Sequence, residues 1–304
     1  MHWILGIDLG GTELKCGAFT PEGELLAKWI GPTRDGELED GRPAFVAEAL
    51  KALARLTGDL GAPPQHIGVA APGLVARDGS SIAFMPGRLQ GLENLDWQRA
   101  LDQPQPVPVL NDAHAALLGE VWCGAARGRR DVVLITLGTG VGGAIVSDGR
   151  LLRGHLGRAG HLGHLTVDHH GPPTITGTPG GIEVAIGNAT VAARTGGRFT
   201  MSRDLAAAAQ AGDAFAQSVW AESVHALAAH LAGVICALDP ELIVIGGGIA
   251  ELDDFLFLPL RSHLDTMEWR PQGHRVEIRK ATLGSWAGTY GAAWNAISAP
   301  TAYQ

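Results

Sequence analysis

The sequence has 304 residues, which is long enough for two domains that each bury a core of their own. Because 46% of the residues are hydrophobic and 18% are charged, the chain should fold as a soluble globular protein. The formal net charge of −8, without any basic run, argues against a nucleic-acid partner.

The chain begins at once with a predicted strand, and it shows no basic region or cleavage site typical of a leader. The most apolar helical stretch, "ALAAHLAGVICAL" (residues 226–238), is interrupted by His230 and is too short to span a bilayer. The three cysteines are scattered and odd in number, so no disulfide framework is expected. These features predict a cytoplasmic protein with no membrane partner.

The first predicted elements form a pattern that occurs twice. An apolar strand ends in a glycine turn at "ILGIDLGGT" (residues 4–12), and a second strand with an acidic turn follows at "GAFTPEGELL" (residues 17–26). The same succession appears at "VVLITLGTGVGG" (residues 132–143) and "GAIVSDGRLL" (residues 143–152). Each copy predicts a three-stranded β-meander, and the repetition indicates a duplicated architecture.

Helices and further strands are predicted between and after the two meanders. In chain order we expect a helix near residues 42–56, strands at 66–73 and 107–112, a helix from residue 112, helices at 181–194 and 213–238, a strand, glycine turn and helix start at 241–251, a strand at 276–283 and a helix at 288–297. This mixture predicts an α/β fold of two domains around a ligand-binding cleft. We place the smaller domain at residues 1–113 plus about 287–304, and the larger domain at residues 114–286.

Three glycine clusters follow predicted strands, and two of them occupy equivalent places in the two meanders. Such turns let backbone N–H groups approach a phosphate chain, while Thr12 adds a hydroxyl and Asp8 a carboxylate for Mg²⁺. Either turn alone is explained by a plain hairpin, but two matched turns favour a phosphate clamp. The third cluster suits a nucleotide base or ribose, although a tight strand–helix turn explains it equally well. The predicted phosphate- and nucleotide-binding residues are Asp8, Gly10, Gly11, Thr12, Gly138, Thr139, Gly140, Gly246, Gly247 and Gly248.

The stretch "LNDAHAA" (residues 110–116) places Asn111 and Asp112 where a strand ends and a helix begins. A carboxylate at a strand end that faces a cleft is a candidate general base. The alternative is that Asp112 caps the helix N-terminus, which is the commoner role of such a residue.

The chain resembles the ROK family of sugar kinases in a set of motifs that occur in the family's order. They are "DLGGT", "AAPG", "LNDA", "LGTGVGGA", "AGHLGH", the Glu183 segment and "IGGG". The resemblance implies the duplicated actin-like (ribonuclease H-like) fold of the actin, hexokinase and Hsp70 ATPase superfamily, and phosphorylation of a sugar hydroxyl with ATP and Mg²⁺. It implies that Asp112 is the catalytic base and that Asp8 is the carboxylate associated with Mg²⁺. The implied sugar-binding residues are Gly73, Asn111, Asp112, His161, His164 and Glu183.

Four histidines lie within ten positions and raise the question of a metal site: His161, His164, His169 and His170. Members of the resembled family commonly bind zinc through the histidine of Glu-x-Gly-His and a following Cys-x-Cys-Gly-x-x-Gly-Cys-x-Glu segment. Here the cysteine positions hold Thr174, Thr176 and Gly181. Since a zinc site needs about four ligands, we expect no structural zinc; the alternative is that His169 and His170 substitute for the thiolates.

His161 stands where the family has a glutamate that accepts hydrogen bonds from sugar hydroxyls. A neutral imidazole offers one acceptor, whereas a carboxylate offers about four lone-pair sites. Either the acceptor sugar is not glucose or is bound weakly, or the substitution is neutral drift within a working glucose kinase.

Two functions other than a kinase compete for this sequence. A non-catalytic sugar-binding protein is motivated by the two departures from the family pattern, although Asp8, Thr12 and Asp112 are all present. A transcriptional regulator would need a helix-turn-helix module before the first strand, for which we find no room. The sequence leaves open the sugar, the hydroxyl that is phosphorylated, the choice between ATP and polyphosphate, and whether the protein is a homodimer.

Overall fold

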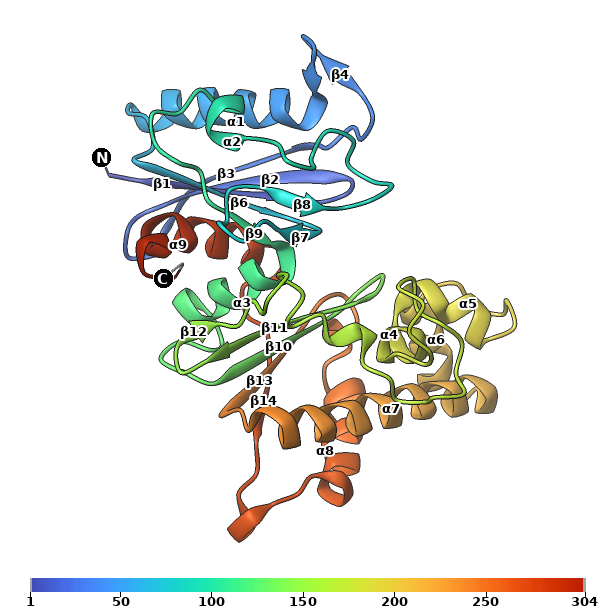
Figure 1. Cartoon of the computed structure of the whole chain (residues 1–304). Helices are drawn as coiled ribbons and strands as arrows, with labels where there is room; N and C mark the ends of the chain where they lie inside the picture. Colours follow the sequence, from blue (N-terminus) through green and yellow to red (C-terminus); the bar gives the residue numbers. More distant parts are fainter. Residues whose placement is uncertain (1, 303–304) are drawn as a thin grey trace. The chain divides into compact units, whose positions relative to one another are not determined.

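The structure is a computed structural model that describes residues 2–302, with side chains described up to residue 298. Its elements fall into two compact units (Figure 1). Unit 1 comprises Met1–Gly128, Arg150–Ala159 and Thr282–Gln304, and unit 2 comprises Arg129–Gly149 and Gly160–Ala281.

The first five-stranded sheet has the order β3–β2–β1–β6–β9. Neighbours within β1–β2–β3 pair antiparallel, as the predicted meander requires, whereas β6 runs parallel to β1 and β9 parallel to β6. The carboxyl ends of β1, β6 and β9 therefore meet at one edge of the sheet. The strands are β1 (Ile4–Leu9), β2 (Glu13–Phe19), β3 (Leu25–Pro32), β6 (His66–Ala71) and β9 (Val109–Asn111).

Helices pack on this sheet, and α9 approaches it most closely. Gly6 of β1 and Gly68 of β6 face the α9 backbone, where a Cβ at either position would overlap the carbonyl groups of Thr289 and Ala292. Glycine at these two strand positions thus lets the helix backbone rest directly on the sheet. The helices of unit 1 are α1 (Ala44–Leu60), α2 (Trp97–Ala100), α3 (Asp112–Cys123), the 3-10 turn η5 (Gly284–Trp286) and α9 (Ala287–Ala302). Two small hairpins, which were not predicted, are β4 (Leu38–Glu39) with β5 (Arg42–Pro43), and β7 (Leu74–Val75) with β8 (Ile82–Phe84).

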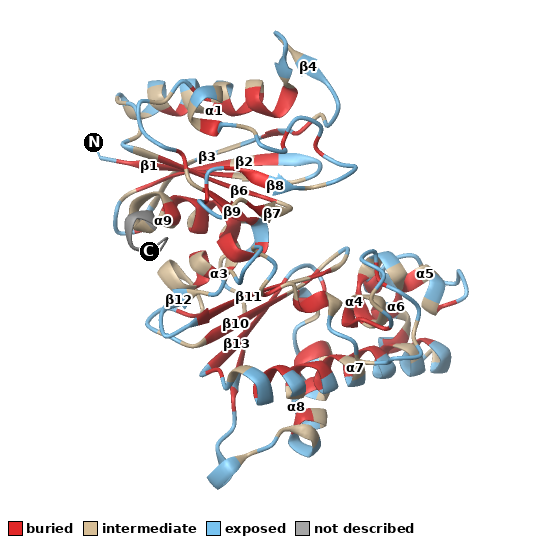
Figure 2. Ribbon diagram, viewed as in Figure 1, coloured by how far each residue is buried: buried red, intermediate tan, exposed pale blue. Residues whose placement is uncertain are grey.

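The second sheet repeats the topology of the first, in the order β12–β11–β10–β13–β14. β10 and β11 pair antiparallel, β13 runs parallel to β10, and β14 runs parallel to β13. β1, β10 and β13 are almost wholly buried, as expected of strands covered on both faces (Figure 2). The predicted duplicated α/β fold is confirmed. The strands are β10 (Val132–Leu137), β11 (Val141–Ser147), β12 (Arg150–Leu151), β13 (Leu242–Gly246) and β14 (Glu277–Lys280).

The helices of unit 2 differ in several places from the predicted ones. The predicted helix at residues 181–194 is wrong: Gly187 takes an extended backbone conformation (ψ 147°) that ends α4, and the chain restarts as a 3-10 turn and a short helix. α6 and α8 were not predicted as separate helices. The helical segments are η1 (Leu162–His164), α4 (Ile182–Ile186), η2 (Asn188–Thr190), α5 (Val191–Arg194), α6 (Ser202–Gln210), α7 (Ala214–Leu238), η3 (Ala250–Leu252), α8 (Asp254–Met267) and η4 (Pro271–Gly273).

The apolar helix α7 is longer than the 13-residue stretch considered from the sequence. Its 25 residues make it, among the described residues, the one helix that is long and apolar enough to cross a membrane by length and composition. Trp220, Val224, Leu227 and Leu231 are buried at helical spacing, in the hydrophobic core of unit 2. α7 is therefore a core helix of this fold.

Unit 1 extends past the domain boundary that we expected at residue 113. α3 belongs to unit 1, where it packs against α9: Gly291 of α9 lies on the backbone of Ala115 of α3. The assignment of domains itself stays a prediction.

Candidate active site

The predicted residues of unit 1 gather at the carboxyl edge of its sheet. Asp8 lies opposite Ala70 on the adjacent parallel strand, and Ala71 lies opposite Asn111 on the next one. Gly73 follows two residues after β6 ends, and Asp112 follows β9 directly. The topology thus brings both carboxylates to one edge, where ligands bind in many open α/β sheets.

Asn111, and not Asp112, caps the N-terminus of α3. The Asn111 Oδ1 atom accepts hydrogen bonds from the backbone N–H of Ala113 (3.0 Å) and His114 (3.3 Å). Its Nδ2 atom donates to the carbonyl of Gly73 (3.1 Å). The N-cap alternative for Asp112 is therefore wrong, because the neighbouring amide already fills that position. Asn111 is buried and uses most of its hydrogen-bonding capacity to hold Gly73 and α3 together.

Asp112 is the first residue of α3, and its side chain is exposed. Its Oδ1 atom accepts from the N–H of Ala113 at 2.8 Å. A carboxylate in the first helical turn is stabilised by the helix dipole, so Asp112 combines a fixed position with an accessible negative charge. Such a group can accept a proton from a bound hydroxyl.

Asp8 is half-buried on β1, close enough to Asp112 for the two charges to interact. Burial and then the Asp112 carboxylate raise the pKa of Asp8 to about 7, while Lys15 acts in the opposite direction. Gly288, in the first turn of α9, packs against the Asp8 carboxylate and leaves no room for a Cβ. A divalent cation would offset both the cost of burying the Asp8 charge and its repulsion by Asp112. These two carboxylates therefore fit a metal such as Mg²⁺.

The turn after β1 is held by one backbone bond within the turn and by the Thr33 hydroxyl, which follows β3. The N–H of Gly10 donates to the carbonyl of Glu13 (2.9 Å), and the carbonyl of Gly10 accepts from the Thr33 hydroxyl (2.7 Å). Gly11 and Thr12 are exposed. The guanidinium of Arg88 lies directly over Gly11. The sequence patterns did not single out Arg88.

Gly73 occupies a position that only glycine fits. Its φ of +111° is a conformation that other residues rarely adopt, and a Cβ would come within 3 Å of Ile82, Phe84 and Met85. Gly73 therefore joins the β7–β8 hairpin to the edge that carries Asn111.

In unit 2 the glycine turns after β10 and β13 lie side by side. Thr136 lies opposite Gly246 on the two parallel strands, so Gly138 and Gly248 leave the sheet at the same edge. Gly247 has a φ of +87° and packs against the Leu137 carbonyl, which a Cβ would overlap. The sequence predicts that both turns bind a nucleotide, and the structure brings the two turns together within unit 2.

A cavity of about 320 Å³ opens beside these turns. The Asn188 Oδ1 atom accepts from the N–H of Ser202 (2.7 Å), and the Ser202 hydroxyl is buried with no partner among the described residues. An unsatisfied buried hydroxyl costs free energy. The sequence patterns missed this wall, because it depends on the break at Gly187. The lining residues are Gly138, Thr139, Asn188, Met201, Ser202, Arg203, Gly248, Ile249, Glu251 and Leu252.

Glu183 lies against the second glycine turn. Its Oε2 atom accepts from the N–H of Val141 (3.0 Å), and Gly140 packs against the same carboxylate. His161 immediately precedes η1, which ends at His164, and both side chains are half-buried. The Cα atom of His164 lies beside Gly181, two residues before Glu183. The structure thus groups His164 and Glu183 within unit 2.

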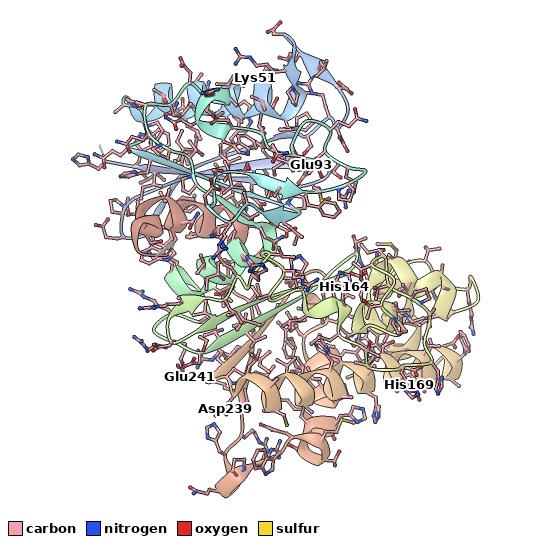
Figure 3. All side chains as sticks on the ribbon, in the orientation of Figure 1. Lys51, Glu93, His164, His169, Asp239 and Glu241 are labelled. Carbon is pink, nitrogen blue, oxygen red and sulfur yellow. The ribbon has the colours of Figure 1, made fainter. Side chains whose placement is uncertain are left out.

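In the segment where the family binds zinc, threonine hydroxyl groups form hydrogen bonds with one another. Thr174 and Thr176 share a hydrogen bond between their Oγ1 atoms (2.9 Å), and Thr176 shares another with Thr178 (3.2 Å). Residues 2–302 contain no group of three or more His, Cys, Asp or Glu side chains that could hold a metal ion. His164 and His169 also lie well apart in Figure 3. The donors do not fit zinc, and the expected absence of zinc stays a prediction.

The comparisons with known proteins cover both units. The model of the ROK family matches residues 4–299. The chain is 35% identical to a glucokinase of Halalkalibacterium halodurans, across 96% of this chain and 94% of the relative. It is 33% identical to an N-acetylmannosamine kinase of Shigella boydii, across 95% and 96%.

Two solved structures share the fold along its whole length. The ROK hexokinase from Thermus thermophilus superposes with a TM-score of 0.85 at 31% identity, covering 98% of this chain and 99% of that one. A ROK family glucokinase from Streptomyces griseus, crystallised in complex with glucose and AMPPNP, gives a TM-score of 0.76 at 28% identity, covering 97% and 99%. AMPPNP is an analogue of ATP, so that relative binds a sugar and an adenine nucleotide on this fold.

Proposed function

Because the chain belongs to the ROK family and is similar to sugar kinases along nearly its whole length, we propose that it is an ATP-dependent carbohydrate kinase. The observation that carries the proposal is Asp112, an exposed carboxylate fixed by the Asn111 cap and close to Asp8. The protein would act in the cytoplasm on a small sugar, with no nucleic-acid or membrane partner.

The nucleotide would bind in unit 2. The cavity beside Gly138 and Gly248 has a volume suited to the nucleoside of ATP. The Ser202 hydroxyl, buried and without a partner among the described side chains, can bond a polar group of the base or ribose. The N–H groups of the turns at residues 10–12 and 138–140 suit phosphate oxygens, as expected of glycine turns. A polyphosphate chain would suit the same turns, so both donors belong in the test.

Asp112 would act as the general base. It accepts the proton of a sugar hydroxyl while the hydroxyl oxygen forms a bond to the γ-phosphorus of ATP. The bond between that phosphorus and the bridging oxygen breaks, and ADP leaves with the electron pair. Since phosphoryl transfer needs mainly positioning and charge stabilisation, a fixed carboxylate and a phosphate-binding turn are the parts that the reaction requires.

Mg²⁺ would be held by Asp8, directly or through water. The cation supplies charge neutralisation for the phosphates when it is bound. Asp8 suits it because burial and the nearby Asp112 make its own negative charge costly without a cation.

The acceptor is the least constrained part of the proposal. We propose that Gly73, Asn111, His161, His164 and Glu183 bind it. The relatives include kinases for glucose and for N-acetylmannosamine at nearly equal identity. The histidine at 161 supplies fewer hydrogen-bond acceptors than a carboxylate, which favours a sugar other than glucose.

A kinase screen tests the proposal. Wild-type protein is incubated with Mg²⁺ and either ATP or polyphosphate, together with hexoses, N-acetylhexosamines, pentoses or polyols, and the sugar phosphate is detected directly. We expect at least one efficient acceptor, with the product lost in Asp112→Asn. Binding of sugar and nucleotide without product for any acceptor would instead establish a non-catalytic sugar-binding protein.

A further inference from the structure

The loop that carries Arg88 is held rigidly by two carboxylates. Glu93 accepts a hydrogen bond from the N–H of Met85 (2.6 Å), and Glu93 is labelled in Figure 3. Asp35 accepts from the N–H of Leu89 and of Gln90, both at 2.8 Å. Leu89 is itself buried in the core of unit 1. The backbone on both sides of Arg88 is thus fixed, although its own side chain is exposed.

The Arg88 side chain lies on the first glycine turn. A Cβ placed on Gly11 would overlap the Nη2 atom of Arg88, so the guanidinium lies against one side of this exposed residue. Among the described side chains, none forms an ion pair with Arg88. The carboxylate of Asp35 accepts from two backbone N–H groups, and the charge of Arg88 acts on it from a distance, behind these bonds, in lowering the pKa of Asp35.

Negative charge gathers at the edge of the sheet where this turn begins. Asp8 and Asp112 are both acidic, and a phosphoryl group arriving at the turn would add further negative charge. Lys15 is already engaged, since its ammonium lies near the Ser285 carbonyl (3.4 Å) and the Glu13 carboxylate (3.8 Å). Arg88 therefore has the uncommitted donors. A guanidinium presents five N–H groups in a planar fork that matches phosphate oxygens.

We propose that Arg88 is a catalytic residue of the kinase reaction, which donates hydrogen bonds to the γ-phosphoryl group of ATP while this group moves to the sugar. The inference rests on the proposed function. In the step, the acceptor oxygen bonds to phosphorus, its proton passes to Asp112, and ADP departs with the electrons of the broken P–O bond. Arg88 keeps its protons throughout and stabilises the negative charge of the transferring group.

The alternative is that Arg88 only packs against the turn and stabilises it. The two roles differ in what they affect: a packing contact affects the melting temperature, whereas a contact with the γ-phosphoryl group affects ATP binding and phosphoryl transfer but not ADP binding. The variants are Arg88→Gln and Arg88→Lys, which keep much of the length of the side chain. Arg77→Gln is the matched control, because Arg77 is also exposed, lies in the turn of the neighbouring β7–β8 hairpin, and is not placed in the site.

The assays are steady-state kinetics with the best acceptor from the screen, ADP binding by calorimetry, and the melting temperature. For Arg88→Gln we expect kcat to fall by about 10²-fold or more, the usual effect of losing one charge-stabilising donor. ADP affinity and the KM for the sugar should change by less than about threefold. Arg88→Lys should recover part of kcat because it keeps the charge, and Arg77→Gln should match the wild type.

Three outcomes would overturn the inference. They are a kcat within about threefold of wild type, a raised sugar KM at unchanged kcat (which would place the guanidinium on the acceptor), and an equal loss of ADP and ATP affinity. A wild-type protein that phosphorylates no acceptor would refute the proposed function itself. This result can be told apart from a failure of the Arg88 proposal, because it is obtained with the wild type alone.

Discussion

Replacing Asp8 by asparagine should make the ligand-free protein more stable and the enzyme less active. Burial first, and then the charge of Asp112, raise the pKa of Asp8 from an ordinary value of 3.8 to about 7. A carboxyl group with a raised pKa in the folded state prefers to stay protonated there. When it must ionise, it therefore costs free energy of folding.

The sign and size of this cost follow from the two pKa values. Below pH 4, Asp8 is protonated in both the folded and the unfolded state, so it costs nothing. Between about pH 4 and pH 7 the unfolded chain loses this proton first, so stability falls as the pH rises, and above pH 7 the penalty is complete. A shift of about three units corresponds to at most about 4 kcal/mol, and we expect about half of this because Asp8 keeps some contact with solvent.

Thermal unfolding of Asp8→Asn at pH 8 and pH 5, without Mg²⁺ or nucleotide, measures the effect. The melting temperature should rise by about 4 °C at pH 8, and the gain should be less than half as large at pH 5. Asp35→Asn is a matched control of opposite sign: backbone N–H groups of Leu89 and Gln90 lower the pKa of Asp35, so this variant should lose stability at pH 8. A lower melting temperature of Asp8→Asn at pH 8, or an equal gain at both pH values, would refute the reasoning.

Three other substitutions, one of them with a matched control variant, test separate parts of the structure. Asp112→Asn should cut kcat by about 10²–10⁴-fold without a large loss of melting temperature, because Asn111 is the cap of α3; retention of more than about a third of kcat would exclude Asp112 as the base. Glu120→Gln should destabilise the protein by about 2–3 kcal/mol, since this fully buried carboxylate accepts from the N–H groups of Ala125, Thr282 and Leu283. Glu241→Gln, which loses similar bonds at the surface, should cost clearly less in the same melting experiment, and equal losses would contradict the role of burial. His161→Glu should raise kcat/KM for glucose about 10- to 100-fold if position 161 sets the preference, and no change with a wild type already efficient on glucose would mean neutral drift.

The strands and their edges could be predicted from the sequence because two signals coincided there. Mostly apolar segments of six residues were each followed by glycine, and the two copies of the meander supported each other. Parallel pairing then brings together whatever follows the strands, which is why Asp8 and Asn111 share an edge. The identity of the cap was not predictable, since Asn111 and Asp112 both suit an N-cap. The structure selects Asn111, whose amide also donates to Gly73.

The cavity of unit 2 and the place of Arg88 could not be predicted, because both depend on contacts between distant segments. The residues from Asn188 to Arg203 follow a break that composition does not reveal: the segment around Gly187 is as apolar and alanine-rich as a continuous helix. Arg88 lies in a loop without periodicity, and only the fold carries its side chain to Gly11. A local sequence pattern predicts local helices and strands, whereas the cavity wall and the contact of Arg88 arise only from the tertiary structure.

The duplication also explains why the two units have different chemistry on one scaffold. Asp8 is the fifth of the six residues of β1, and the fifth residue of β10 is Thr136. Both face a parallel neighbour, Ala70 in one sheet and Gly246 in the other, so the backbone environment is the same while the side chains differ. A carboxylate at position 136 would stand beside the Gly138 turn and repel the phosphates proposed to bind there, whereas a threonine does not. The strand β10 therefore adds no carboxylate to the turn that follows it, where Glu183 already accepts from the N–H of Val141.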